Sequence, residues 1–282
     1  MRKHCIAAAV LAGLVLGSSL GFAQSPNGLE RMYVLRCGTG HALDKSRWSP
    51  GVDVGVEFDV SDNCYLIKHK QGYMLWDGGI PDSVANLPDG VAGANGAPSW
   101  RMPKTVASQL AEIGVKPSDV KYIGISHTHP DHVGNVDMFP QATILIQKAE
   151  YDWAFSRGNP GFFASGAPRF SADHPATKLD GDKDVFGDGS VMIISTPGHT
   201  PGHQSLLVKL PKTGAVMLSG DAAHFKSNWD NKRIPAGNVD KEKSLTSMQH
   251  MADLLAQTKG QLWMNHDKAQ SDSQKHAPEF YD

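Results

Sequence analysis

Residues 126–132 read SHTHPDH, and this stretch is the most specific feature of the sequence. His127, His129, Asp131 and His132 fall within six residues, directly after a run that is typical of a buried strand. The pattern HxHxDH is expected by chance about 0.002 times in a chain of this length and composition. In an extended turn the first two histidines can face one metal, and the aspartate and the last histidine can face a second metal nearby.

Imidazole and carboxylate are the ligands that zinc takes in hydrolytic sites. The alternative for such a stretch is a polar loop of histidines that are hydrogen-bonded to one another. The specificity of the motif favours metal binding, and we predict two divalent metal ions, with zinc as the expected element.

Three later segments also carry histidine or aspartate where a predicted strand ends. They are residues 196–203, TPGHTPGH, residues 220–224, GDAAH, and residues 265–267, NHD. Ligands at the ends of different strands can converge on one site. Each segment alone is a weak signal, whereas the three in this order after HxHxDH are a strong one.

The composition is that of a globular protein. Of 282 residues, 40% are hydrophobic and 20% are charged, and the formal net charge is −2. The charge balance excludes a strongly basic nucleic-acid-binding protein. Beyond the N-terminal region no apolar stretch reaches the roughly 18 residues that a membrane span needs. We therefore expect a small-molecule substrate, no nucleic acid, and no membrane association once the leader is removed.

The N-terminal residues 1–23 have the pattern of a secretory signal peptide. A basic start precedes an apolar run over residues 5–16, and Gly21-Phe22-Ala23 fits the small-x-small rule for cleavage. A membrane anchor is the alternative, but the run is short for one. We predict cleavage after Ala23, a single domain over residues 24–282, and a periplasmic or secreted location.

Two cysteines, Cys37 and Cys64, remain in the mature chain. They could form one disulfide in an oxidising compartment, or they could stay as buried thiols. The sequence leaves both open. Neither cysteine has the spacing of a thiolate metal site.

The order of the predicted elements favours a mixed α/β sandwich. Short β-prone runs over residues 54–60 and 64–68 are separated by a polar segment that predicts a turn, and helical spacing appears over residues 106–113. Residues 81–103 form a Gly-, Ala- and Pro-rich loop that is too long for a simple connection. Aromatic residues beside such irregular segments, Trp48 among them, could wall an apolar pocket or pack on the core.

Together these motifs resemble the metallo-β-lactamase-fold hydrolase superfamily and, within it, the N-acyl-homoserine lactonase-like branch. The resemblance covers nearly the whole mature chain, from YMLWDGG at residues 73–79 to NHD at residues 265–267. The run TPGHTPGHQSLL at residues 196–207 is especially similar. The resemblance implies an αβ/βα four-layer sandwich of two mixed sheets with outer helices and a two-metal site at its edge.

The resemblance also implies a role for each candidate residue. The first metal would be bound by His127, His129 and His199, the second by Asp131, His132 and His266, and Asp221 would bridge the two. Asp77 would hold a ligand histidine or its turn, and His203 would be structural. Asp131 is also the candidate that carries a proton to the leaving oxygen. His224 stands where this branch commonly has a tyrosine, and either it contacts the substrate or it is an ordinary residue of the pocket wall.

The implied activity is the opening of lactone rings, with N-acyl-homoserine lactones as the first choice, by attack of a metal-bridging hydroxide. The main alternative is a phosphotriesterase or another ester or thioester hydrolase of the same fold. A β-lactamase fits less well because Asp221 is placed to bridge both metals. A redox diiron protein also fits less well, because such proteins resemble HxExDH and this chain has His129 at the position of the glutamate. For assembly, we allow for a homodimer.

Overall fold

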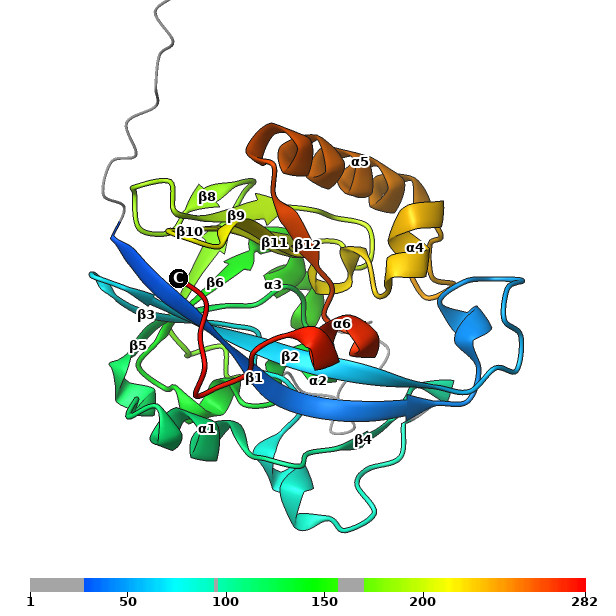
Figure 1. Ribbon diagram of the computed structural model, residues 1–282, viewed down its shortest axis with the longest axis horizontal. Helices are drawn as coiled ribbons and strands as arrows, with labels where there is room; N and C mark the ends of the chain where they lie inside the picture. Colours follow the sequence, from blue (N-terminus) through cyan, green and yellow to red (C-terminus); the bar gives the residue numbers. More distant parts are fainter. Residues whose placement is uncertain (1–27, 94–95, 157–169) are drawn as a thin grey trace, which may run out of the picture.

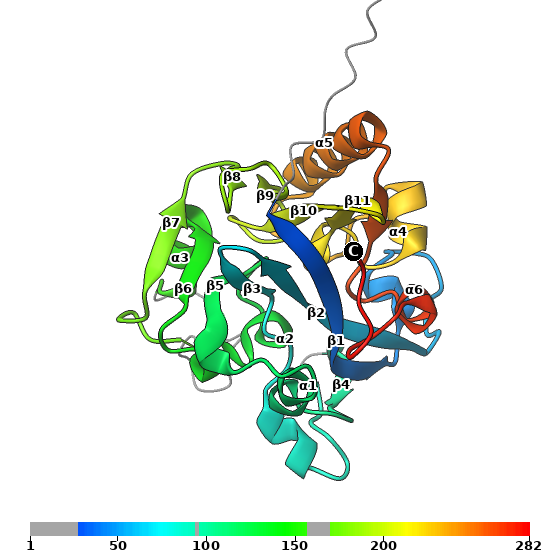
Figure 2. The same ribbon diagram turned by 60° about the vertical axis from the view of Figure 1, so that its left-hand side comes forward.

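The computed structural model describes residues 28–93, 96–156 and 170–282. The predicted signal peptide, residues 1–23, lies outside these residues, so its cleavage stays a prediction. The described chain forms two β-sheets that pack face to face, with helices on the outer side of each sheet (Figures 1 and 2). The predicted α/β class and the layer order are therefore confirmed.

The larger sheet has seven strands in the order β4-β1-β2-β3-β5-β6-β7. Its strands are β1 (Leu29–Ala42), β2 (Phe58–His69), β3 (Gly72–Trp76), β4 (Ser99–Arg101), β5 (Val120–Gly124), β6 (Thr143–Gln147) and β7 (Ala176–Leu179). Strands β1, β2 and β3 pair antiparallel, whereas β3, β5, β6 and β7 pair parallel. The sheet is therefore mixed.

The smaller sheet has five strands in the order β12-β11-β10-β9-β8. Its strands are β8 (Lys183–Asp184), β9 (Val191–Ser195), β10 (Gln204–Leu210), β11 (Gly214–Leu218) and β12 (Gln261–Trp263). Strand β12 runs parallel to β11, and the other pairs are antiparallel. This sheet is therefore mixed as well.

Helices connect and cover the two sheets. The α-helices of the described chain are α1 (Val106–Glu112), α2 (Pro130–Val133), α3 (Lys148–Ala154), α4 (Lys226–Asn231), α5 (Lys241–Thr258) and α6 (Lys268–Ser273). Short 3-10 helices are η1 (Lys45–Arg47), η2 (Asp82–Asn86), η4 (Pro117–Asp119), η5 (Val136–Met138) and η6 (Gly220–Ala222). None of the described helices is both long and apolar enough to cross a bilayer.

Neighbouring residues of β1 show how the layers are built. Val34 packs between the two sheets with Leu206 of β10, whereas Leu35 packs on the outer side with Leu110 of α1. Successive side chains of a strand point to opposite faces, so β1 is buried on both of them. On the far side of the molecule α5 covers the smaller sheet (Figure 1), and its Met251 packs in one cluster with Met217 of β11. With both faces of each sheet covered, the loops at the strand ends are left to form a site.

The predicted turn between residues 60 and 64 is wrong. The structure has one continuous strand, β2, and its middle residues pair with β1, which the sequence pattern did not predict. The polar side chains in this stretch are buried because distant partners take their hydrogen bonds. Ser61 Oγ donates a hydrogen bond to the backbone carbonyl of Asn265, and Asp62 Oδ1 accepts one from the side-chain amide of Asn265. The segment resembles a turn in composition, but its partners lie at the other end of the chain.

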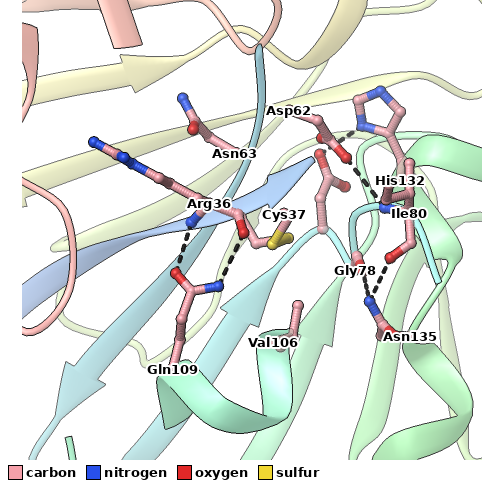
Figure 3. The surroundings of a disulfide bond; sticks show 12 residues. Arg36, Cys37, Asp62, Asn63, Gly78, Ile80, Val106, Gln109, His132 and Asn135 are labelled. Atoms are coloured by element: carbon pink, nitrogen blue, oxygen red, sulfur yellow. Dashed lines mark hydrogen bonds and ion pairs between the residues drawn. A yellow bond between two sulfur atoms is a disulfide. The ribbon is translucent and has the colours of Figure 1, made fainter. Parts of the chain in front are cut away.

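Cys37 and Cys64 form a disulfide between β1 and β2, which settles the point that the sequence left open. Figure 3 shows it beside the turn after β3, where Gly78 and Ile80 accept hydrogen bonds from Asn135. Gly79 has φ +60°, and a Cβ there would lie 2.2 Å from the Cβ of Cys37. A glycine is therefore required where this turn crosses the disulfide.

Candidate metal centre

The seven predicted ligands come together at one edge of the sandwich, and each lies just beyond the carboxyl end of a strand. His127 and His129 follow β5, His199 follows β9, and His266 follows β12. Asp131 and His132 lie in α2, and Asp221 lies in η6 directly after β11. The two sheets thus contribute ligands to the same site, as convergence at strand ends predicts.

The first cluster contains His127, His129, His199 and Asp221, whose donor atoms all lie within 4.8 Å of one another. Nε2 of His199 is 3.2 Å from Asp221 Oδ2 and 3.0 Å from His129 Nδ1. Nε2 of His127 is 3.6 Å from the same aspartate oxygen. Four donor atoms this close together can contact one cation.

The second cluster contains Asp131, His132 and His266, again within 4.8 Å of one another. The other oxygen of Asp221, Oδ1, lies 3.3 Å from His132 Nε2 and 3.1 Å from His266 Nε2. One oxygen of Asp221 therefore faces each cluster. This is the arrangement that a carboxylate bridging two cations requires.

The donor set fits two divalent cations. Within the described part of the chain, His127 Nε2, His132 Nε2 and Asp221 Oδ1 are buried and have no hydrogen-bond partner. A buried polar atom without a partner costs about 1–3 kcal/mol, and such atoms are rare in native proteins. Imidazole nitrogen and carboxylate oxygen are ligands of zinc and of similar metals. Cations at the two clusters would satisfy all three atoms.

Three ligand histidines are oriented by their second nitrogen. His132 Nδ1 donates to Asp77 Oδ2 at 2.9 Å, which is the contact that the resemblance implied for Asp77. His266 Nδ1 donates to the carbonyl of Ser61 at 2.8 Å, and His199 Nδ1 lies 2.9 Å from Asn238 Oδ1. Donation through Nδ1 leaves the Nε2 lone pair available for a metal.

His203 has the structural position that was expected for it. Its Nε2 accepts a hydrogen bond from the backbone amide of Asp221 at 2.9 Å, and its Nδ1 lies 3.1 Å from the carbonyl of Thr196. Burial lowers the pKa of His203 to about 3, so the ring is neutral and can accept this bond. A Cβ on Gly220, which has φ +51°, would lie 2.7 Å from His203 Nε2. The histidine therefore positions the bridging aspartate through its backbone.

Burial and neighbouring charges move the titration of the ligands in opposite directions. Burial, with the neighbouring imidazoles, lowers the pKa of His127 and of His129 well below its usual value. Burial also acts to lower the pKa of His132, but the carboxylates of Asp221 and Asp77 outweigh it and raise the value well above normal. For Asp221, burial is outweighed by the surrounding imidazoles, which lower its pKa well below normal. Asp221 is thus an ionised carboxylate.

His224 lies at the centre as well. Its side chain is 3% exposed, and its Nε2 is 3.1 Å from Asp221 Oδ2. Its ring lies 5.5 Å from that of His266, at an interplanar angle of 24°, and 6.3 Å from that of Trp48. Burial lowers the pKa of His224 to about 4, so its ring is neutral. Asp221, His224 and His266 form a third close group of donor atoms.

A cavity of about 630 Å³ opens above the two clusters. Its floor includes Asp131, His224 and His266, and its walls are mainly apolar. The wall residues include Trp48, Val60, Ile80, Val84, Leu87 and Trp100. Sequence analysis singled out Trp48 but missed Trp100 and the residues of η2. The unusual length of the loop over residues 81–103 was the signal that could have indicated them.

The sequence is similar to those of known proteins. The family model described as the metallo-beta-lactamase superfamily matches residues 59–258. The N-acyl homoserine lactonase AttM of Azorhizobium caulinodans is 34% identical over 239 residues, which cover 81% of this chain and 90% of that protein. An N-acyl homoserine lactonase of Bacillus cereus is 31% identical over 242 residues, covering 84% and 94%.

Solved structures of lactonases are also similar to this chain. The crystal structure of a quorum-quenching N-acyl homoserine lactone lactonase has a TM-score of 0.75 at 28% identity, and the match covers 89% of this chain and 98% of that one. The structure of an N-acyl homoserine lactone hydrolase with N-hexanoyl-L-homoserine bound at its catalytic metal centre has a TM-score of 0.76 at 27% identity, with 89% and 99% covered.

Proposed function

The chain belongs to the metallo-beta-lactamase superfamily, and on this basis we propose that it is a dinuclear metal-dependent hydrolase that opens the ring of N-acyl homoserine lactones. The observation that carries the proposal is the position of Asp221, with one carboxylate oxygen toward each donor cluster at the floor of an apolar cavity. The relatives and the solved structure that are lactonases, and that align with 81–89% of this chain, support this substrate class.

We propose that the two cations are zinc and that each donor cluster would hold one of them. His127, His129 and His199 would bind one, Asp131, His132 and His266 would bind the other, and Asp221 would contact both. When bound, two such cations polarise a carbonyl group and lower the pKa of water toward neutrality. The imidazole-rich donor set of the first cluster favours zinc over iron.

Asp131 is placed to move a proton. Its side chain is 20% exposed, it lines the cavity, and its Oδ2 lies 3.7 Å from His266 Nε2. A carboxylate at this position can accept a proton from the attacking water and deliver it to the alkoxide that leaves when the ring opens. No other carboxylate among the described cavity residues combines this exposure with a place beside the second cluster.

His224 completes the floor on the other side of Asp221. Its ring lies 5.2 Å from that of His199 and 5.5 Å from that of His266, so a carbonyl group above the two clusters would contact it. A neutral imidazole can donate one hydrogen bond to such an oxygen. We assign it the substrate-contacting role, which is one of the two alternatives that the resemblance left for this position.

The cavity suits an acyl chain. Val84, Leu87 and Trp100 give it apolar walls, and a cavity of about 630 Å³ is in the range of pockets that bind drug-sized molecules. An acyl homoserine lactone carries its polar ring at one end, so the ring would lie over the metals and the chain along this wall.

The proposed location is the periplasm or the extracellular space. It is supported by the signal-peptide pattern of residues 1–23 and by the disulfide between Cys37 and Cys64, since disulfides persist in oxidising compartments.

The test is a hydrolysis panel on zinc-reconstituted protein. The panel contains acyl homoserine lactones with short and long chains, phosphotriesters, thioesters and β-lactams. We expect the largest kcat/KM for the lactones, with activity lost after chelation and recovered with zinc. Rapid hydrolysis of another class while these lactones stay closed would contradict the proposal.

A further inference from the structure

We propose that Glu150 is a positioning residue that holds together the two loops of the first metal cluster and thereby sets the metal affinity of that cluster. Glu150 lies in α3, has no exposed surface, and belongs to none of the donor clusters. A fully buried carboxylate is rare unless its oxygens are hydrogen-bonded. The inference therefore begins with what these oxygens contact.

Each carboxylate oxygen of Glu150 holds a different loop. Oε1 accepts hydrogen bonds from the backbone amide of Thr128 at 2.8 Å and from its hydroxyl at 2.9 Å. Oε2 accepts a hydrogen bond from the backbone amide of Gly202 at 3.0 Å. All three donors are N–H or O–H groups, so both carboxylate oxygens of Glu150 act as acceptors.

Both loops carry ligands of the first cluster. Thr128 stands between His127 and His129, and Gly202 belongs to the turn that begins after β9 and contains His199. The first loop follows β5 of the larger sheet, whereas the second joins two strands of the smaller sheet. Glu150 therefore joins ligand loops from opposite layers of the sandwich.

Close backbone contact reinforces this connection. A Cβ added to Gly202 would lie 2.3 Å from the backbone nitrogen of Glu150, so the turn rests directly on the first residues of α3. A glycine is needed at that point because any side chain would push the turn away from the helix. The distance between the two ligand loops is thus fixed by side-chain and backbone contacts at the same residue.

The second cluster is held by other groups. His132 is oriented by Asp77, and His266 is oriented by the carbonyl of Ser61. None of the hydrogen bonds described for Glu150 reaches Asp131, His132 or His266. Loss of the Glu150 carboxylate should therefore weaken one cluster and spare the other, which general destabilisation of the fold would not do.

The test compares Glu150→Gln with a matched control, Asp188→Asn. Glutamine keeps the size of the side chain but replaces one acceptor oxygen by an NH2 group, which faces an N–H donor of one loop. Asp188 also holds two backbone amides, of Gly28 and Ser190, but it belongs to none of the donor clusters. The two variants each lose one acceptor from a carboxylate that holds two segments.

Zinc release is measured by titrating the zinc-loaded full chain with a chelator, and His199→Ala identifies the release step of the first cluster. We expect Glu150→Gln to lower the zinc affinity of the first cluster about 10- to 100-fold, which is the usual effect of losing a group that orients metal ligands. The zinc affinity of the second cluster should stay within about twofold of the value for the parent protein. Asp188→Asn should lower the melting temperature and leave both steps unchanged.

Parent-like release of both metals from Glu150→Gln would overturn the inference, and so would equal weakening of both steps. If Glu150→Gln does not fold, Thr128→Val removes the hydroxyl donor while keeping the backbone bond. We expect it to weaken the first step two- to fivefold, and an unchanged step would overturn the inference. The inference rests on the proposed metal centre. If the parent protein bound no zinc, both the proposed metal centre and this inference would be overturned. If the parent protein bound two zinc ions and Glu150→Gln released them in the same way, only the inference would be overturned.

Discussion

Asp77 Oδ2 accepts a hydrogen bond from Nδ1 of His132 at 2.9 Å, across 55 residues of sequence. The second oxygen of Asp77 accepts from the backbone amide of Ser126 at 2.7 Å, and the amide of Gly78 donates to the carbonyl of His132 at 2.6 Å. The turn after β3 thus holds both the ring and the backbone of this ligand. As a result, Nε2 of His132 points to Asp221 and lies 3.3 Å from its Oδ1.

Replacing Asp77 by Asn should weaken the second cluster. Asp77 has φ +59°, a conformation that Asn adopts readily, so the backbone should be retained. The neutral amide orients His132 less firmly, and we expect zinc affinity at that cluster to fall about 10- to 100-fold. Chelator titration measures the change. Asp53→Asn, at a surface aspartate with φ +55°, is the matched control and should bind zinc like the parent. If Asp77→Asn released zinc from the second cluster as the parent protein does, the orienting role of Asp77 would be refuted.

Zinc affinity should depend on pH through His266. Burial lowers the pKa of this ring, but the carboxylates of Asp221 and Asp131 outweigh burial and raise the pKa to about 9 in the metal-free protein. A cation needs the neutral ring, so binding must release this proton below pH 9 and need not do so above it. We expect affinity at the second cluster to rise by about tenfold or more per pH unit between pH 7 and 9 and then to level off. Competition titrations at several pH values measure this, and a flat profile would contradict it.

The disulfide should add to the stability of the fold. Cys37 and Cys64 are 27 residues apart, and closing a loop of that length is worth about 3.5 kcal/mol in the chain-entropy description. Urea unfolding of the parent protein with and without a phosphine reductant should show a loss of this order. A double variant, Cys37→Ala with Cys64→Ala, should not respond to the reductant. Equal stability of the oxidised and reduced parent would show that the bond does not stabilise the fold.

Leu87 should contribute to the binding of long acyl chains. It lines the cavity and is 48% exposed, so truncation to alanine should change stability little. Loss of its contact with a bound chain should raise KM about fivefold for a long-chain lactone, while KM for a four-carbon chain stays within about twofold. Leu43→Ala is the control, because Leu43 is 66% exposed and lies outside the cavity wall. Equal effects on short and long chains would place the acyl group elsewhere.

The candidate residues of the metal centre could be singled out from the sequence because their signals are local, whereas their assignment to two metals came from the family resemblance. His127, His129, Asp131 and His132 lie within one short motif, and the other ligands lie at the ends of strands that short apolar runs reveal. Such patterns depend on neighbouring residues alone, so they can be recognised without knowledge of the tertiary structure.

Two of the supporting groups, Asp62 and Glu150, could not be predicted, because their partners are distant. Asp62 appears in a polar segment typical of a turn, yet Asn265, 203 residues away, completes its hydrogen bonds inside a strand. Glu150 has the sequence context of an ordinary helix, and its partner Gly202 lies 52 residues further on. The roles of Asp62 and Glu150 depend on packing between distant parts of the chain, which the spacing of residues in the sequence does not indicate.

Anomalous diffraction at the zinc edge from crystals of the zinc-loaded protein would test the two-metal centre most directly. We expect two peaks on either side of Asp221, one contacted by His127, His129 and His199 and the other by Asp131, His132 and His266. A single peak, or zinc bound away from Asp221, would contradict the account.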